Sequence, residues 1–228
     1  MRSLWRGPPS LEVAPLSDEP RLEAISPSRG DRWGATRAEF IARGILAGGA
    51  LAGGGALLVA LPRDAISAPS PAQDQKILNF ALGLEYIEAG FYAEAFAKRK
   101  LSGELLDYVS TVRQHERAHV DFLKEVLGSK ARKEPELDFG DATSDPEKFT
   151  PAAIALEETM VAAYNGQAVN LTKGTLAKAA TIVSVEARHA GWIRAIAGRN
   201  PAPDATDTPK TAAEVQAAVN RTGFVKSS

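Results

Sequence analysis

The strongest constraint on this chain is a Glu-x-x-His pattern that occurs twice, at Glu116 to His119 and at Glu186 to His189. The two patterns use two of the three histidines in the chain. In an α-helix, residues three positions apart lie on one face about a turn apart, so each pattern directs a carboxylate and an imidazole the same way. Two such pairs favour a helical protein with a metal site over a helical protein without one.

Each pattern belongs to a longer unit that is also repeated. Glu85 is followed by Tyr92, and Glu157 by Tyr164, at the same spacing of seven residues and after a leucine in both copies. From this glutamate to the one in Glu-x-x-His there are 31 residues in the first copy (85 to 116) and 29 in the second (157 to 186). A two-helix unit used twice predicts a pseudo-twofold arrangement with a shared site between the copies.

The residues after 71 have apolar positions at helical spacing and lack the alternating Val, Ile and Thr runs that are typical of strands. We therefore expect an all-α fold. Ser102 and Thr150, the latter followed by a proline, are the expected N-caps of the second and third helices. The four helices are expected at about 72–100, 104–128, 151–170 and 175–197. A tail at 198–228 contains a short predicted helix near 211–221, for which the sequence indicates no role.

The connection between the second and third predicted helices determines the topology. It contains about twenty residues rich in proline, glycine and charge, and when extended it spans about 65 Å, more than the roughly 40 Å length of the bundle. It can therefore run back along the bundle, which gives an up-down-down-up order with the two short turns at opposite ends. The acidic residues of each hairpin lie about 22 Å from their own turn, so both sets meet near the middle of the bundle.

Glu85 lies on an otherwise apolar face of the first predicted helix. A carboxylate buried there costs several kcal/mol unless it is paired or binds a metal. With Glu157 and the two Glu-x-x-His pairs it makes four carboxylates and two imidazoles, the ligand set of di-iron and di-manganese helix bundles. These hard ligands favour iron or manganese over thiophilic metals, and we expect two iron ions, with manganese also compatible. Because the chain has no cysteine, thiolate zinc sites, iron–sulfur clusters and a cysteine nucleophile are excluded within it.

This pattern resembles the ferritin-like superfamily and is most similar to the exported ferritin-like domain proteins that include plant desiccation-related proteins. The resemblance covers about residues 72–197 and implies a ferritin-like four-helix bundle with a long crossover between its second and third helices. It implies that Glu116 and Glu186 bridge two metal ions. It also implies that Glu85 and Glu157 are terminal ligands, one for each ion.

The resemblance implies further roles for the residues on either side of the bridging glutamates. His119 and His189 are expected to bind one ion each, and Tyr92 and Tyr164 are expected to support the ligands. We expect no catalytic residues beyond the metal ligands.

Two other glutamates are alternative ligands. Glu88 also faces inward on its predicted helix, and Glu158 replaces Glu157 after a small rotation of its helix. The shared spacing to a tyrosine favours Glu85 and Glu157.

The chain departs from one family pattern. In bacterioferritin-like members an aspartate precedes each bridging glutamate and orients the opposite histidine, whereas here these positions hold His115 and Val185. His115 is expected to be a surface residue. Phe122 and Trp192, which follow the two patterns, are expected to serve packing only.

The first 71 residues differ in composition from the rest. Residues 1–36 are rich in proline, serine and charge and are expected to be disordered, and residues 45–61 form an uncharged apolar run that leads into a linker. This order is typical of an export signal. The residues from Thr36 to Ala42 resemble a twin-arginine signal with one arginine, Arg37. We therefore expect an exported protein, periplasmic, secreted or at the cell surface; removal of the signal and its retention as a membrane anchor both stay open.

The expected function follows from the ligand set. The charges are balanced, with 27 Lys and Arg against 28 Asp and Glu, so nucleic acid is not an expected partner. We expect a di-iron carboxylate protein with O₂- or peroxide-dependent oxidase or ferroxidase-type activity outside the cytoplasm. The alternative is a non-catalytic, stress-protective or metal-sequestering bundle.

Without a cysteine-ligated iron domain in the chain, electrons come from Fe(II) itself or from a separate donor. The oligomeric state stays open.

Overall fold

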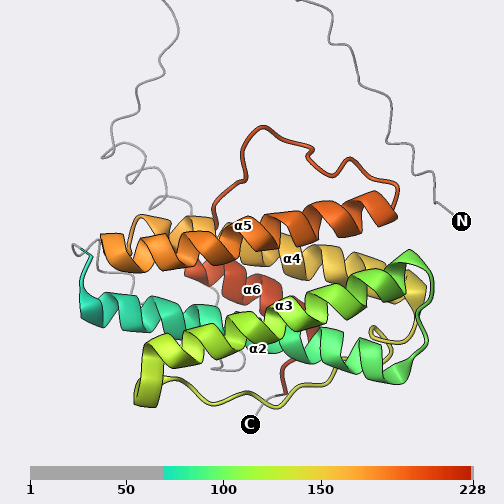
Figure 1. Cartoon of the computed structure of the whole chain (residues 1–228), viewed down its shortest axis with the longest axis horizontal. Helices are drawn as coiled ribbons and strands as arrows, with labels where there is room; N and C mark the ends of the chain where they lie inside the picture. Colours follow the sequence, from blue (N-terminus) through green and yellow to red (C-terminus); the bar gives the residue numbers. More distant parts are fainter. Residues whose placement is uncertain (1–68, 227–228) are drawn as a thin grey trace, which may run out of the picture. The chain divides into compact units, whose positions relative to one another are not determined.

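The computed structural model describes residues 69–226, which form the predicted all-α fold (Figure 1). The helices of this part of the chain are α2 (Pro71–Lys98), α3 (Glu104–Leu127), the short 3-10 helix η1 (Gly128–Lys130), α4 (Pro146–Ala168), α5 (Lys173–Ile196) and α6 (Ala212–Thr222). Within the same residues, β-structure is limited to an isolated bridge between Leu137 and Val225.

The four long helices form a bundle in the predicted up-down-down-up order. α2 and α3 pack as one hairpin and α4 and α5 as the other, and the hairpins meet through α2 against α4 and α3 against α5. In Figure 1 the turn after α2 lies at the right-hand end and the turn after α4 at the left-hand end. The two pairs of Glu-x-x-His residues, which lie on α3 and α5, therefore belong to neighbouring helices.

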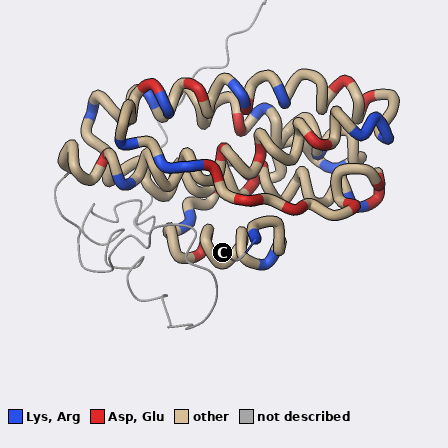
Figure 2. The backbone as a smooth tube through the Cα atoms, turned by 90° about the horizontal axis from the view of Figure 1, so that it is seen from below, with Lys and Arg blue, Asp and Glu red and all other residues tan. Residues whose placement is uncertain are grey.

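The connection from η1 to α4 runs along α2, as the predicted crossover requires. Near one end of α2, the side-chain amide of Asn79 donates to the carbonyl of Lys130 at 3.0 Å, and near the other end Lys98 Nζ donates to the carbonyl of Gly140 at 2.8 Å. Figure 2 looks onto this connection, in which basic residues are followed by acidic ones. The crossover thus places the start of α4 at the same end of the bundle as the start of α3.

The third helix begins earlier than the sequence analysis predicts. Its N-cap is Asp145, whose carboxylate accepts from the backbone N–H of Glu147 at 3.0 Å, and Pro146 occupies the first turn. The predicted start at Thr150 is therefore wrong. Pro151 lies inside the helix at the cost of one backbone hydrogen bond. The additional turn buries Phe149, whose ring stacks on Phe91 with centroids 5.2 Å apart.

The N-cap of α3 and the start of α5 also differ from expectation. The N-cap of α3 is Gly103 with φ of 57°, and no side chain caps this helix, so the prediction of Ser102 as its cap is wrong. α5 begins two residues before its predicted start because Asp74 of α2 binds its first turn. The carboxylate of Asp74 accepts from the backbone N–H of Thr172 at 2.9 Å and from the hydroxyls of Thr172 and Thr175 at 2.5 and 2.6 Å.

α6 and the residues that follow it pack on the bundle, although the sequence indicated no role for this helix. α6 lies against α4 and buries Val215 and Val219. The ring of Phe224 then packs on two aromatic rings of the core, with its centroid 5.8 Å from that of Phe91 and 5.2 Å from that of Phe139. This segment therefore contributes to the same core as the four long helices.

Gly166 allows the segment before α6 to pass close to α4. Nearby, the backbone N–H of Lys210 donates to the carbonyl of Ala162 at 3.0 Å, and a Cβ on Gly166 would collide with the carbonyl group of Lys210. We expect Gly166→Ala to lower the free energy of unfolding by about 1–3 kcal/mol and to speed proteolysis of residues 198–211. Gly174→Ala is the control, because a Cβ there meets nothing within 4 Å. Equal losses in the two variants would contradict this packing.

The predicted export signal, with its apolar run at 45–61, lies outside the described residues. None of the helices within residues 69–226 combines the length and the apolar composition needed to cross a bilayer.

Candidate metal centre

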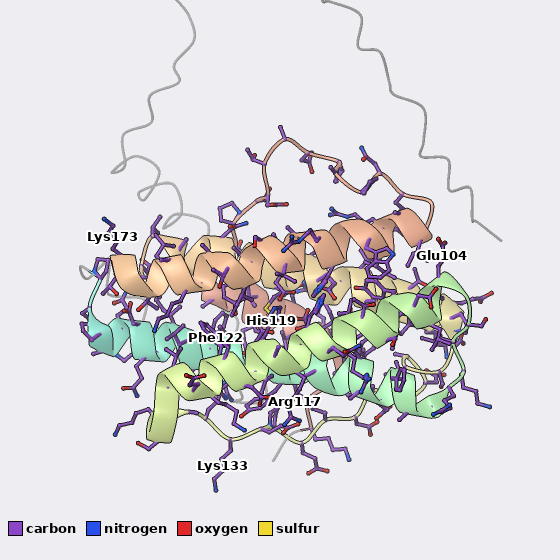
Figure 3. The ribbon with its side chains drawn as sticks, viewed as in Figure 1. Glu104, Arg117, His119, Phe122, Lys133 and Lys173 are labelled. Carbon is purple, nitrogen blue, oxygen red and sulfur yellow. The ribbon has the colours of Figure 1, made fainter. Side chains whose placement is uncertain are left out.

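The six residues predicted as metal ligands come together in the middle of the bundle. All six are buried, with exposed fractions of at most 8%. They are Glu85 from α2, Glu116 and His119 from α3, Glu157 from α4, and Glu186 and His189 from α5. Figure 3 shows His119 on the side of α3 that faces α5, whereas Arg117 lies on the other side of the same helix.

The ligands divide into two groups of four that share two members. Glu116 and Glu186 belong to both groups; Glu85 and His119 complete one, and Glu157 and His189 complete the other. Within each group the ligand atoms lie within 4.8 Å of one another. Two glutamates common to both groups are the arrangement that a pair of carboxylate-bridged ions requires.

His119 lies close to all three glutamates of the first group. Its Nδ1 lies 2.8 Å from Oε1 of Glu186, 3.4 Å from Oε2 of Glu85 and 3.5 Å from Oε2 of Glu116. One imidazole nitrogen therefore faces one oxygen from each of three helices.

His189 repeats this arrangement in the second group. Its Nδ1 lies 3.1 Å from Oε1 of Glu116, 3.5 Å from Oε2 of Glu157 and 3.5 Å from Oε2 of Glu186. Each bridging glutamate thus presents one oxygen to each histidine. This is the pseudo-twofold relation that the repeated sequence unit predicts.

The inward-facing atoms of the centre lie close to one another, but among the described residues none of them has a hydrogen-bond partner with suitable geometry. They are Oε2 of Glu85 and Glu157, both carboxylate oxygens of Glu116 and Glu186, and Nδ1 of His119 and His189. Buried polar atoms without partners are rare in folded proteins, so a cluster of them needs an explanation. Two divalent cations would supply it, because four carboxylates would balance their charge and every one of these atoms is a metal ligand of a suitable type. The residues present therefore fit a dinuclear centre.

The electrostatics of the metal-free centre agree with this fit. Burial opposes protonation of His119 and His189, but the carboxylates, Glu116 first, raise the pKa of each to about 12. Burial, and then the charge of Glu186, raise the pKa of Glu116 well above 4.5. For Glu186 itself, burial raises the pKa, but its contacts with the two histidines outweigh it and lower the pKa. Without metal the centre thus holds protons, which two cations would displace.

Comparison with known families agrees with the bundle and its ligands. A model of the ferritin-like domain matches residues 73–199, more than half of the chain. The chain belongs to the ferritin-like domain family. The predicted superfamily is thereby confirmed, whereas membership of its exported, desiccation-related group stays a prediction. No curated protein matches the chain.

The two repeated tyrosines of this ferritin-like domain lie beside the terminal glutamates. The hydroxyl of Tyr92 donates to Oε1 of Glu157, and the hydroxyl of Tyr164 donates to Oε1 of Glu85 at 2.7 Å. Each tyrosine therefore holds the glutamate of the other repeat and leaves Oε2 directed at the centre. Their support of metal ligands stays a prediction, but the contacts it requires are present.

Sequence reasoning missed Tyr108, which lies on α3. Its hydroxyl donates to Oε1 of Glu157 at 2.9 Å and lies 3.1 Å from the hydroxyl of Tyr92. Its ring also packs edge-on against Trp192, with centroids 5.2 Å apart. No signal in the repeat points to Tyr108, because the second unit has no tyrosine at the equivalent position.

The two alternative glutamates have different environments. Glu88 is fully buried, and neither of its carboxylate oxygens has a hydrogen-bond partner among the described residues, but it belongs to neither ligand group. Burial, followed by the charges of Glu157 and Glu116, raises its pKa well above 4.5. Glu158 instead forms an ion pair with Arg194 at 2.7 Å. Its half-exposed side chain does not belong to the cluster.

A cleft between α3 and α5 leads from the surface to the histidines. Its volume is about 490 Å³, and its lining consists of His115, Ala118, His119, Val185, Arg188, His189 and Trp192. His115 is exposed, as expected, but its Nδ1 also lies 2.9 Å from Nε2 of His189. Trp192, predicted to serve packing, packs on Tyr108 and is 37% exposed, whereas Phe122 lies against the core.

Proposed function

We propose that this protein binds two metal ions, most readily iron, and uses them in an O₂- or peroxide-dependent oxidase or ferroxidase-type reaction. Glu116 and Glu186 would bridge the ions, Glu85 and His119 would complete one ligand set, and Glu157 and His189 would complete the other. The observation that carries the proposal is the convergence of unpartnered buried oxygens and imidazole nitrogens on one point in the bundle.

Iron bound in this centre would supply one-electron steps to O₂ or peroxide from two neighbouring ions. The protein side chains hold and shield it. The bridging glutamates fix the ions close together, while Tyr92 and Tyr164 orient the terminal glutamates. The surrounding core is apolar, so water reaches the centre mainly from the cleft between α3 and α5.

The supply of electrons follows from composition. The 228 residues contain no cysteine, so they cannot build a cysteine-ligated iron domain that delivers electrons to the centre. We therefore propose that Fe(II) itself is oxidised, or that a separate donor reduces the centre.

The test is an anaerobic Fe(II) titration of the full chain followed by addition of O₂. We expect saturation at two ions per chain and consumption of O₂ after mixing. Saturation at two ions without O₂ uptake would favour the non-catalytic, metal-sequestering alternative. Absence of binding would refute both. Metal analysis of protein purified without added metal would decide between iron and manganese.

We also propose that the protein acts outside the cytoplasm, on the basis of the basic, apolar and small-residue segments before residue 69. Residues 1–71 fused to a reporter that is active only after export should give activity. Replacing Arg37 with glutamate should lower that activity if the twin-arginine-like segment directs export. A reporter retained in the cytoplasm would refute the proposal.

A further inference from the structure

The pseudo-twofold symmetry of the metal centre is broken at one pair of positions. The residue before Glu116 on α3 is His115, and the residue before Glu186 on α5 is Val185. Both line the cleft between the two helices. The side chain of His115 can form hydrogen bonds and that of Val185 cannot, so the two halves of the centre have different surroundings.

His115 holds the ring of His189. Its Nδ1 lies 2.9 Å from Nε2 of His189, and the two rings stack with centroids 5.2 Å apart and planes 14° apart. Because Nδ1 of His189 faces the glutamates, Nε2 is the nitrogen left to carry the proton when Nδ1 binds a cation. Donation from Nε2–H to His115 then fixes both the tautomer and the orientation of the ligand.

Among residues 69–226, no side chain forms such a hydrogen bond with Nε2 of His119. Val185, which lines the same cleft, has no polar side-chain atom. The side chain of His119 is 11% exposed, against 3% for that of His189. The cleft therefore reaches the first ligand group more openly than the second.

We propose that the two ion positions differ in metal affinity and in access. His115 raises the affinity of the position at Glu157 and His189 and shields it from the cleft. The position at Glu85 and His119 binds its ion more weakly and is accessible to small ligands from the cleft. This inference rests on the proposed metal centre and goes beyond it. A hydrogen-bonded partner of a metal-binding histidine typically changes metal affinity by about 10–100-fold, so we expect the two dissociation constants to differ by about that factor.

The inequality can be measured with Co(II), whose visible absorption reports its ligands without a change of oxidation state. The full chain should bind two Co(II) ions in two resolved steps. Azide, a small anionic probe, should alter the absorption of the ion bound in the weaker step and leave the tighter one unchanged.

The broken symmetry provides matched variants. His115→Val, which copies the residue at 185, should weaken the tighter step by about 10–100-fold and make the two steps alike. His115→Asn should restore much of the difference, because its Oδ1 can accept the same hydrogen bond. Val185→His should tighten the weaker step by supplying a partner for His119, and should reduce the effect of azide. His115 is exposed, so the metal-free His115→Val protein should remain folded, which far-UV circular dichroism checks.

Two outcomes overturn the inference. Two equal steps in the unmodified protein would show that the positions are alike. An equal loss at both steps in His115→Val would show that His115 does not act through His189. Failure to bind Co(II) at all would instead count against the metal centre itself, so the two proposals fail in different ways.

Discussion

Replacing Glu116 with alanine is expected to abolish binding of both metal ions rather than of one. Its Oε1 lies 3.1 Å from Nδ1 of His189 and its Oε2 lies 3.5 Å from Nδ1 of His119, so a single side chain serves both ligand groups. Loss of a residue that merely supports a ligand costs about 10–100-fold in affinity, and loss of a shared ligand should cost more than about 100-fold at each position. Calorimetric titration with Fe(II) under argon measures both.

Glu85→Ala is the matched comparison, because Glu85 belongs to one group only. It should remove one ion and leave the other. Glu94→Ala controls for the loss of a partly exposed carboxylate on α2, since Glu94 pairs with Lys98 away from the centre. Far-UV circular dichroism of the metal-free Glu116→Ala protein checks that it is folded, because the mutation also removes a contact 3.1 Å from Nδ1 of His189. Retention of one tightly bound ion in Glu116→Ala would contradict the bridging role.

The convergence of the six side chains could be predicted from the sequence because their positions follow two strong periodicities. The spacing within Glu-x-x-His follows the helical turn, and the repeated spacing from Glu85 to Tyr92 and from Glu157 to Tyr164 marks equivalent positions in two helices. The length of the crossover then determined how the hairpins could meet. Each of these signals is contained within one helix or one connection, which is why no structure was needed to read it.

The remaining contacts depend on tertiary packing that has no periodic signal. Tyr108 reaches Glu157 from a neighbouring helix, and its position is not repeated. α4 starts at Pro146 because burial of Phe149 stabilises an additional turn, and this packing gives no local signal beside the cap and proline at Thr150. The hydrogen bond between His115 and His189 joins two helices, so an exposed histidine on one of them gave no indication of it.

The metal-free protein should become more stable as the pH falls from about 8 to 6.5. His119 and His189 have a folded-state pKa of about 12 and an ordinary value of 6.5. A group whose pKa is raised by folding stabilises the fold fully below its unfolded pKa and loses that contribution as the pH rises toward its folded pKa. Over this interval each histidine can add up to about 2 kcal/mol to the free energy of unfolding. Glu88 and Glu116, whose pKa values are also raised, act in the same direction at lower pH.

The metal-loaded protein should show the opposite dependence. Cations bind neutral imidazoles and ionised carboxylates, so protons compete with them, and loading weakens as the pH falls toward about 5. Bound metal stabilises the fold by about 4 kcal/mol when the free metal concentration is 1,000 times the dissociation constant. This stabilisation is lost as the pH falls toward about 5. Chemical unfolding in the presence of a chelator and of saturating metal should therefore give curves of stability against pH that slope in opposite directions. Parallel curves would mean that the ions do not displace protons from His119 and His189, and hence that these histidines are not metal ligands.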